Sequence, residues 1–214
     1  VMGFADKNIR TPKDLIGKRI MMTPGDGVSQ AFTPFLKING IKLDQIAVIA
    51  GDVQAKRVTL MTGNSDLVGG NLNDQGPSIE NITGKPVRAI VFSDWGVHQI
   101  ASGIEVNKAL IAKNPDLIRR FMRATTKAYL ATRASPEAAA DAMLKAAPLA
   151  GKREVIVNSI KLGLPYHDIV EGKNPFYVSL QRVQETVKFL VDYARLDPKA
   201  LKRADSFVNL SFIQ

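Results

Sequence analysis

Residues 18–30, KRIMMTPGDGVSQ, decide how this chain is expected to fold. The apolar residues 20–22 predict a strand, which runs through a loop of glycine and aspartate into the start of a helix. The N–H groups of such a loop and of the first helical turn have no acceptor inside the helix, so they favour anionic or acceptor-rich ligands. The alternative, that the glycines serve only the turn, stays open. The candidate ligand-binding loop consists of Gly25, Asp26, Gly27, Val28 and Ser29.

The first half of the chain alternates between predicted strands and helices. Strands are expected at residues 20–22, 46–50, 67–68 and 87–92, and helices at residues 30–38 and 52–61. Residues 46–50, IAVIA, have the composition of a strand that is buried on both faces, which indicates a parallel sheet covered on both sides. Ligands of such sheets bind at the carboxyl ends of the strands, where residues 25–29 are expected to lie.

From Asn107 onward the pattern predicts helices alone. Four times, a side chain that caps helices precedes a proline, which is favoured at the first helical position: Asn114-Pro115, Ser135-Pro136, Asn174-Pro175 and Asp197-Pro198. Two apolar stripes need a partner surface, one with Leu117, Phe121, Thr125 and Ala128, the other with Phe176, Leu180, Val183, Val187 and Leu190. Basic side chains at positions 119, 120, 123 and 127 are expected mostly on the opposite, solvated side of their helix.

The composition predicts a folded chain that forms no disulfide and no thiolate site. The 214 residues are 45% hydrophobic and 23% charged, enough for a sizeable core, and the absence of cysteine excludes disulfides and thiolate metal sites. No apolar run approaches the roughly 20 residues of a membrane helix, and the first residues lack the pattern of a signal peptide. The net charge of +9 is spread along the chain and aromatic residues make up only 7%, so nucleic acid is not an expected partner.

Several motifs resemble, in the same order, those of one class of binding proteins. Residues 11–20, TPKDLIGKRI, followed by TPGD at residues 23–26, are similar to the opening of the second lobe in NMT1/THI5-like substrate-binding proteins, the nitrate/sulfonate/taurine and thiamin-pyrimidine class. Similar motifs follow at residues 63–69 (GNSDLVG), 73–77 (NDQGP), 93–97 (SDWGV) and 114–121 (NPDLIRRF). The resemblance covers essentially the whole chain.

This resemblance implies an α/β fold of the type 2 periplasmic-binding-protein class. Residues 1–103 would form the second lobe with a parallel-rich sheet, and residues 104–214 the carboxyl-terminal helices that pack on a first lobe missing from this chain. The function implied is that of a solute receptor of an ABC importer, periplasmic or extracytoplasmic, whose partners are a small solute and the permease subunits. No enzyme activity, cofactor, metal site or membrane insertion of this segment is expected.

The resemblance also suggests which residues select the solute. Asn73 and Gln75 are expected to be polar selectors, and Trp95, the only tryptophan, a wall on which a heteroaromatic, pyrimidine-like solute stacks. Gln75 stands where the family usually has glutamate, and its neutral amide both donates and accepts hydrogen bonds. An anionic solute, and a packing role for Trp95, stay open as alternatives. His98 is expected to be a surface or supporting residue.

Two other functions remain open at this point: a ligand-sensing regulatory domain of similar fold, and an enzyme that resembles thiamin-pyrimidine synthases. The enzyme has less support, because those proteins carry a cysteine-rich motif and this chain contains only two histidines and no cysteine. No nucleophile elbow, zinc-protease motif or phosphate-binding loop occurs in the sequence.

Overall fold

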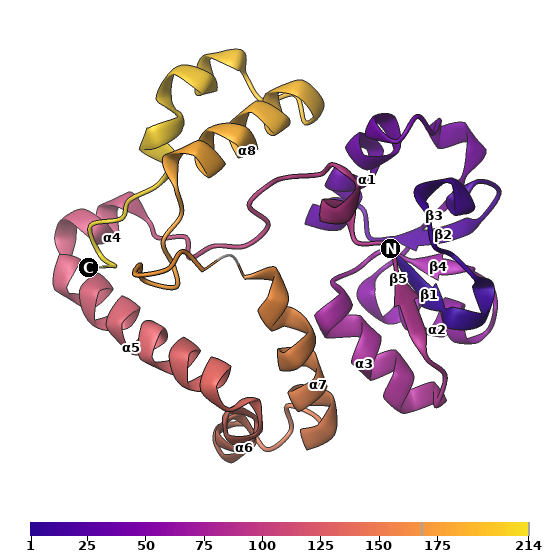
Figure 1. The fold of residues 1–214 in the computed structure, drawn as a ribbon, viewed down its shortest axis with the longest axis horizontal. Helices are drawn as coiled ribbons and strands as arrows, with labels where there is room; N and C mark the ends of the chain where they lie inside the picture. The colour runs from indigo at the N-terminus through magenta and orange to yellow at the C-terminus, as the bar shows by residue number, and fades with distance from the viewer. Residues whose placement is uncertain (168, 214) are drawn as a thin grey trace. The chain divides into compact units, whose positions relative to one another are not determined.

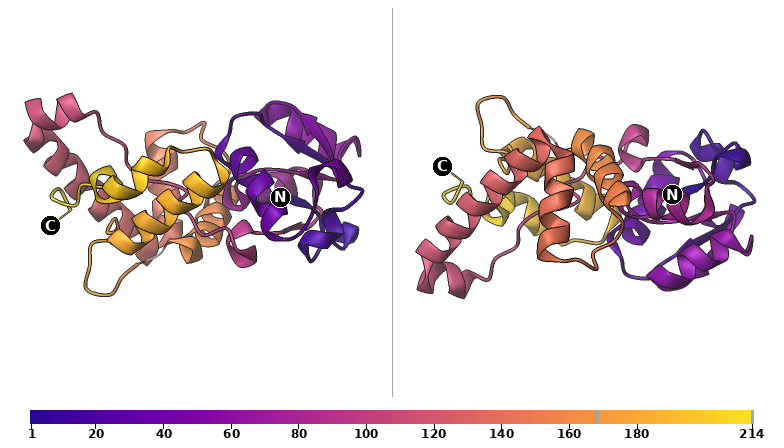
Figure 2. Two further views of the ribbon diagram at one scale, coloured as in Figure 1. Left: turned by 90° about the horizontal axis from the view of Figure 1, so that it is seen from above. Right: turned by 90° about the horizontal axis from the view of Figure 1, so that it is seen from below.

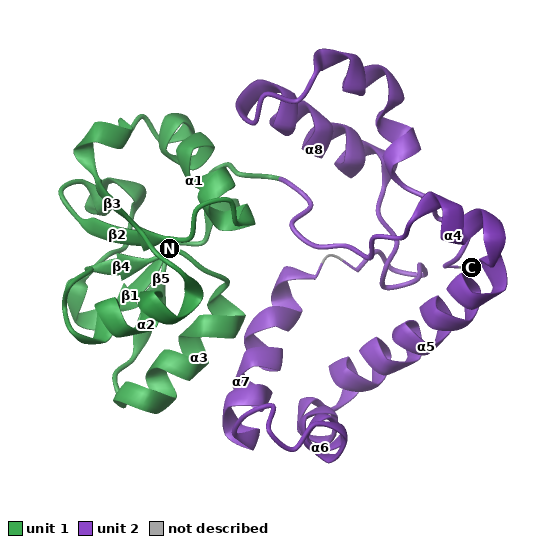
Figure 3. Ribbon diagram, turned by 180° about the vertical axis from the view of Figure 1, so that it is seen from behind, with its two compact units in different colours: residues 1–98 green, residues 99–214 purple. Residues whose placement is uncertain are grey.

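The computed structural model describes residues 1–167 and 169–213, and the chain divides into two compact units, residues 1–98 and 99–214 (Figure 3). Unit 1 contains all the strands of the described chain, and unit 2 is built from helices. This confirms the predicted α/β fold and the change to helices in the second half. The assignment of residues 1–103 and 104–214 to two lobes stays a prediction.

Unit 1 is organised around one five-stranded sheet in the order β3-β2-β4-β1-β5 (Figure 1). The strands are β1 (Met2–Phe4), β2 (Arg19–Met22), β3 (Ala47–Ala50), β4 (Leu67–Val68) and β5 (Val87–Ala89). β2 pairs in parallel with β3 and β4, whereas β1 runs antiparallel to β4 and β5. The carboxyl ends of β2, β3, β4 and β5 therefore lie along one edge of the sheet.

Three helices follow the parallel strands of unit 1. They are α1 (Gly27–Ile38), α2 (Val53–Met61) and α3 (Leu72–Thr83). Four short 3-10 helices complete the unit: η1 (Ala5–Lys7), η2 (Pro12–Leu15), η3 (Leu43–Gln45) and η4 (Phe92–Trp95). The start of α1 lies three residues before the predicted start, because Asp26 caps the helix by accepting a hydrogen bond from the Ser29 N–H.

The helices cover both faces of the sheet. Met21 packs in one apolar cluster with Leu60 of α2 and Ile79 of α3. Its neighbours in β2, Ile20 and Met22, point to the opposite face and are also buried. This is the face of α1, since the Met22 sulfur and Val28 of α1 lie beside the same glycine, Gly69.

Some sequence predictions for unit 1 are wrong in detail. β3 is not buried on both faces, because it is the edge strand of the sheet, and Val48 is 46% exposed. The predicted strand at residues 87–92 ends at Ala89, and η4 begins at Phe92. Neither β1 nor α3 was predicted.

Unit 2 consists of helices joined by irregular segments. The helices are α4 (Lys108–Lys113), α5 (Pro115–Ala134), α6 (Pro136–Ala146), α7 (Arg153–Gly163), η5 (Leu164–Tyr166), α8 (Leu180–Tyr193) and η6 (Pro198–Phe207). α8 and η6 lie side by side (Figure 2), where Val183 and Val187 pack against Ala200 and Ala204. No helix of the described residues is long and apolar enough to cross a membrane.

Three of the four predicted helix starts are confirmed, at Asn114, Ser135 and Asp197, whose side chains cap α5, α6 and η6. The fourth is wrong. The Asn174 side chain accepts a hydrogen bond from the Phe176 N–H two residues later, which closes a turn, and α8 begins only at Leu180 behind the Ser179 cap.

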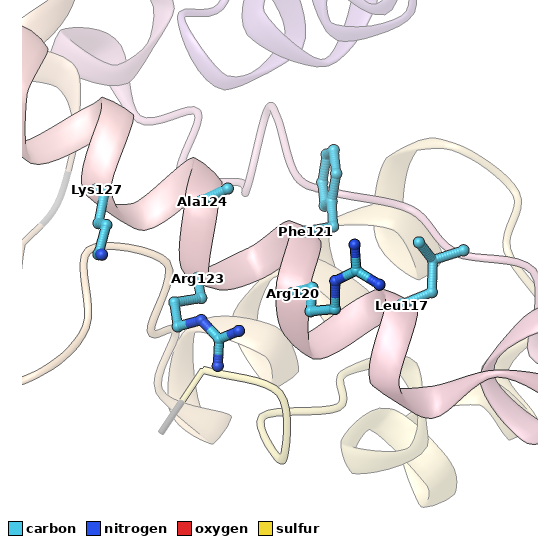
Figure 4. A pocket seen from close by; sticks show the side chains of 6 residues that line it. All are labelled: Leu117, Arg120, Phe121, Arg123, Ala124 and Lys127. Atoms are coloured by element: carbon cyan, nitrogen blue, oxygen red, sulfur yellow. The ribbon is translucent and has the colours of Figure 1, made fainter.

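The predicted apolar stripe of α5 is exposed within the described chain. Helix α5 buries Ile118 and Met122 instead. Leu117 and Phe121 border a hollow together with three of the basic residues, Arg120, Arg123 and Lys127, and with Ala124 (Figure 4). In Figure 4, Arg123 and Lys127 point away from Leu117 and Phe121, and the hollow lies between the two sets of side chains. The prediction that the basic residues lie mostly on the side away from the apolar stripe stays a prediction.

An ion pair ties β2 to the segment before β4. Asp66 accepts hydrogen bonds from the backbone N–H of Arg19 at 2.9 Å and from its Nε at 3.2 Å. The hydrogen bond from the Arg19 side chain, with help from the backbone N–H and against the effect of burial, lowers the pKa of the Asp66 carboxyl. A lowered folded-state pKa stabilises the protein above the unfolded-state pKa of about 3.9, and this stabilisation is lost as the pH falls through the folded-state pKa.

We expect Asp66→Asn to lower the free energy of unfolding at pH 7 by about 1 kcal/mol and to flatten its decline below about pH 4. Urea unfolding followed by the fluorescence of Trp95, which lies in the same unit, measures both effects. Asp44→Asn, in the exposed helix η3, is the control. A pH profile of Asp66→Asn as steep as that of the unchanged protein would contradict the expectation.

Candidate functional site

The loops that follow β2, β3 and β4 meet at the carboxyl edge of the sheet in unit 1. The Gly51 N–H donates to the Met22 carbonyl at 3.0 Å, and the Gly69 N–H donates to the Met21 carbonyl at 2.8 Å. These bonds extend the parallel ladders and hold the three loops at one level. Each loop leads into the N-terminus of a helix, so α1, α2 and α3 all begin at this edge.

The predicted ligand-binding loop forms the N-terminal cap of α1. Gly25 adopts a φ of +82°, a conformation that favours glycine, and Gly25 and Gly27 are exposed. The Ser29 N–H donates to Asp26 Oδ1 at 2.7 Å, and the Ser29 hydroxyl donates to the Asp26 carbonyl at 2.9 Å. The N–H groups of Gly27 and Val28 have no acceptor within the helix and are the groups left for a ligand. The loop is thus a structured turn that also presents donors at the edge.

Asp26 is held by a buried lysine of α2. Lys56 is 1% exposed, and its Nζ lies 3.0 Å from Asp26 Oδ2. Burial raises the pKa of Asp26, but the hydrogen bonds from Ser29 and Lys56 outweigh it, and the net effect lowers the pKa. The sequence analysis did not single out Lys56. Its burial could have been inferred from its position four residues before Leu60, which places it on the side of the helix that packs against the sheet.

Gln75 of α3 is a buried amide without a partner for its oxygen. Its side chain is 3% exposed, and Oε1 has no hydrogen bond among the described residues. The amide lies against Gly70, where an added Cβ would approach Gln75 Nε2 to 2.5 Å. The hydroxyl of Thr23, in the loop after β2, is buried and likewise unpaired within the described chain. Two oxygens at this edge therefore lack a donor.

The remaining predicted site residues lie in different surroundings. Asn73 is exposed in the first turn of α3, two residues from Gln75. Trp95 is half-buried, and its carbonyl accepts a hydrogen bond from Asn39 at the C-terminal end of α1. Because α1 has 12 residues, that end lies about 18 Å along the helix from Gly27. The loop at residues 25–29 thus lies close to the loop after β4, and Gln75 packs against this second loop. The backbone of Trp95 lies away from both loops.

His98 is exposed at the end of unit 1. Within the described residues, no group of three His, Asp or Glu side chains could hold a metal ion.

Comparisons with known proteins point to one family. The family described as NMT1/THI5 like matches residues 1–139. Over 66 residues the chain is 39% identical to the riboflavin-binding protein RibY of Chloroflexus aurantiacus, a match that spans 28% of this chain and 19% of that protein.

Solved structures match over nearly the whole chain. The periplasmic aliphatic sulphonate binding protein SsuA from Escherichia coli matches with a TM-score of 0.67 and 16% identity, over 95% of this chain and 67% of that one. The alkanesulfonate-binding protein SsuA from Xanthomonas axonopodis pv. citri matches with a TM-score of 0.64 and 13% identity, over the same shares of both chains. These likenesses confirm the fold. The chain spans about two thirds of the length of these two proteins.

The close approach of Gly70 and Gln75 is testable without a ligand. We expect Gly70→Ala to lower the free energy of unfolding by about 1–3 kcal/mol, because its Cβ would displace a buried amide. Most of that loss should disappear when Gln75→Ala removes the amide. Gly27→Ala is the control, since an added Cβ there meets no atom within 4 Å. Equal losses with and without the Gln75 side chain would contradict the contact.

Proposed function

Because the chain belongs to the NMT1/THI5 like family, we propose that it is part of the solute-binding receptor of an ABC importer. The solute binds at the carboxyl edge of the sheet in unit 1, against the loop at residues 25–29 and α3. The receptor works by binding and release. Closure of two lobes around the solute produces the form that the permease subunits recognise, on the outer side of the membrane.

The observation that carries this proposal is the unpaired oxygen of Gln75. A buried polar group without a hydrogen bond costs about 1–3 kcal/mol, so such groups are rare unless a bound molecule completes them. Gln75 Oε1 lies beside the loop after β4, and the N-terminus of α1 borders the same loop through Val28 and Gly69. A solute with an N–H donor and an acceptor would satisfy both elements.

We propose a heteroaromatic solute with an amide-like edge, such as a pyrimidine or an isoalloxazine. An amide side chain offers one donor and one acceptor, which complement a ring C=O beside a ring N–H. The relative RibY is a riboflavin-binding protein, and riboflavin is a member of this class of solutes. Residues 104–214 are proposed to cover the sheet of the first lobe, which gives the exposed stripe of α5 its partner.

Mass spectrometry of small molecules released from the purified protein is the direct test of the function. Recovery of a stoichiometric heteroaromatic compound supports the proposal. Absence of any bound compound, together with no binding in a panel of heteroaromatic and sulfonate solutes, would contradict it.

Replacement of the buried amide should separate binding from stability. We expect Gln75→Leu to weaken binding of the recovered solute by about 1–3 kcal/mol while leaving the free energy of unfolding equal or higher, because it removes an unsatisfied polar group. Trp95→Leu should weaken binding less, since its backbone lies at the far end of α1. Calorimetry measures the affinities. A larger loss in Trp95→Leu would move the site toward η4.

The loop can be tested by blocking its surface. Gly27→Val adds a side chain where the folded protein has open space and a φ that is not positive, so we expect little change in the free energy of unfolding. The solute loses its approach to the N–H groups, and binding should weaken by more than about 1 kcal/mol. Gly27→Ala, with its smaller side chain, should weaken binding less. Unchanged affinity in Gly27→Val would mean that the loop is only a turn.

A further inference from the structure

We propose that the Asp26–Lys56 ion pair makes this receptor select uncharged solutes, because the carboxylate of Asp26 already occupies the place that an anionic solute would take. The inference rests on the proposed function, since it concerns the solute that binds at the same edge. It identifies Asp26 and Lys56 as residues that determine specificity.

A single carboxylate occupies one N–H group at the start of α1 and the buried ammonium of Lys56. Asp26 Oδ1 accepts the Ser29 N–H at 2.7 Å, and Oδ2 lies 3.0 Å from Lys56 Nζ. The side chain of Lys56 is 1% exposed and that of Asp26 is 32% exposed. The ammonium is thus shielded from solvent, and its counter-ion is the group at the edge. An incoming anion would meet the carboxylate before it met the ammonium.

The other charges near the edge do not restore an attraction for anions. Asp52 caps α2 by accepting the Ala55 N–H at 2.8 Å, and Asp74 lies in the first turn of α3. Each of the three helices therefore begins with an acidic residue in or next to its first turn.

Helix α2 carries a second cation directly after Lys56. Arg57 follows Lys56, and its Nε is buried without a hydrogen bond among the described residues. Because this nitrogen has no partner there, Arg57 is the other cation of α2 that an anion could bind in place of Lys56. The experiment therefore contains a variant that removes it.

The buried ammonium is the reason why Asp26 matters beyond its own charge. A buried charge without a partner is strongly unfavourable, so removing one member of such a pair leaves a site that an outside ion of the same sign can fill. Without the carboxylate, the edge would combine the Lys56 ammonium with the free N–H groups and the positive end of the α1 dipole. The loss of one carboxylate should therefore convert the edge into an anion site.

Asp26→Ser tests this conversion, because serine still caps a helix but carries no charge. The probe is sodium sulfate against sodium chloride at equal ionic strength, in a buffer without sulfonates. We expect sulfate to raise the unfolding temperature of Asp26→Ser, followed by Trp95 fluorescence, by at least about 4 °C more than chloride does. The unchanged protein should show only the general stabilisation that sulfate gives folded proteins, and the difference of about 4 °C is counted in excess of that effect.

Two matched variants identify the cation. In Asp26→Ser combined with Lys56→Met the sulfate effect should disappear, whereas in Asp26→Ser combined with Arg57→Gln it should persist. If Asp26→Ser does not fold, Asp26→Asn replaces it, since its amide oxygen keeps the cap. Persistence of the effect without Lys56, or its loss without Arg57, would overturn the assignment to the ion pair.

The inference is also overturned if sulfate, or methanesulfonate, stabilises the unchanged protein over chloride as much as it stabilises Asp26→Ser. That result would leave the proposed receptor function standing with an anionic solute. Failure of the receptor function has a different signature, namely the absence of any bound or binding solute, whatever the response of the variants to sulfate.

Discussion

The parallel pairing of β2 with β3 on one side and with β4 on the other is the constraint on which the rest of unit 1 depends. In this register Ile20 lies opposite both Val48 and Leu67. The three strands consequently end together, and the loops behind them start at the same level. This alignment sets the positions of the polar groups at the edge, which include the cap of α1 and the amide of Gln75.

Local patterns in the sequence were enough to predict the elements that make this alignment. They failed for elements whose position or burial depends on residues far away in the sequence. β2, α2 and β4 were predicted because short apolar runs and caps such as Asp52 act within a few residues. β1 has only three residues and gains its stability from pairing with β5 at the other end of the unit. The exposure of β3 could not be predicted, because an apolar strand looks the same at the edge and in the middle of a sheet.

In the candidate site, too, features set by neighbouring residues could be predicted, and features set by distant contacts could not. The loop at residues 25–29 could be recognised because a strand, a glycine turn and a capping aspartate follow one another in the chain. That Lys56 reaches the cap of α1 depends on a contact between two helices that no spacing encodes. Gln75 was expected at the site, but its burial depends on how α3 packs in unit 1. The role of Trp95 stays a prediction. It was expected near the other residues because it follows β5, and its backbone lies at the C-terminal end of α1, where Phe92 stacks on Phe35 with ring centroids 4.4 Å apart.

Lys56 and Gln75 are both polar side chains buried at a sheet edge, but only Lys56 has a partner among the described residues. The ammonium is compensated within the protein, so a solute gains nothing by offering it a charge and would have to displace a carboxylate to reach it. Among the described residues the amide oxygen has no donor, so in the proposed receptor a solute that offers a donor removes the cost of an unsatisfied buried group. In the proposed receptor, the binding free energy at this edge comes from hydrogen bonds to neutral groups and from the dipole of α1, and much less from net charge. We propose that this balance separates the chain from a receptor for anions with the same fold, because the fold supplies the helix N-termini in both cases and the side chains behind them decide which charge is accepted.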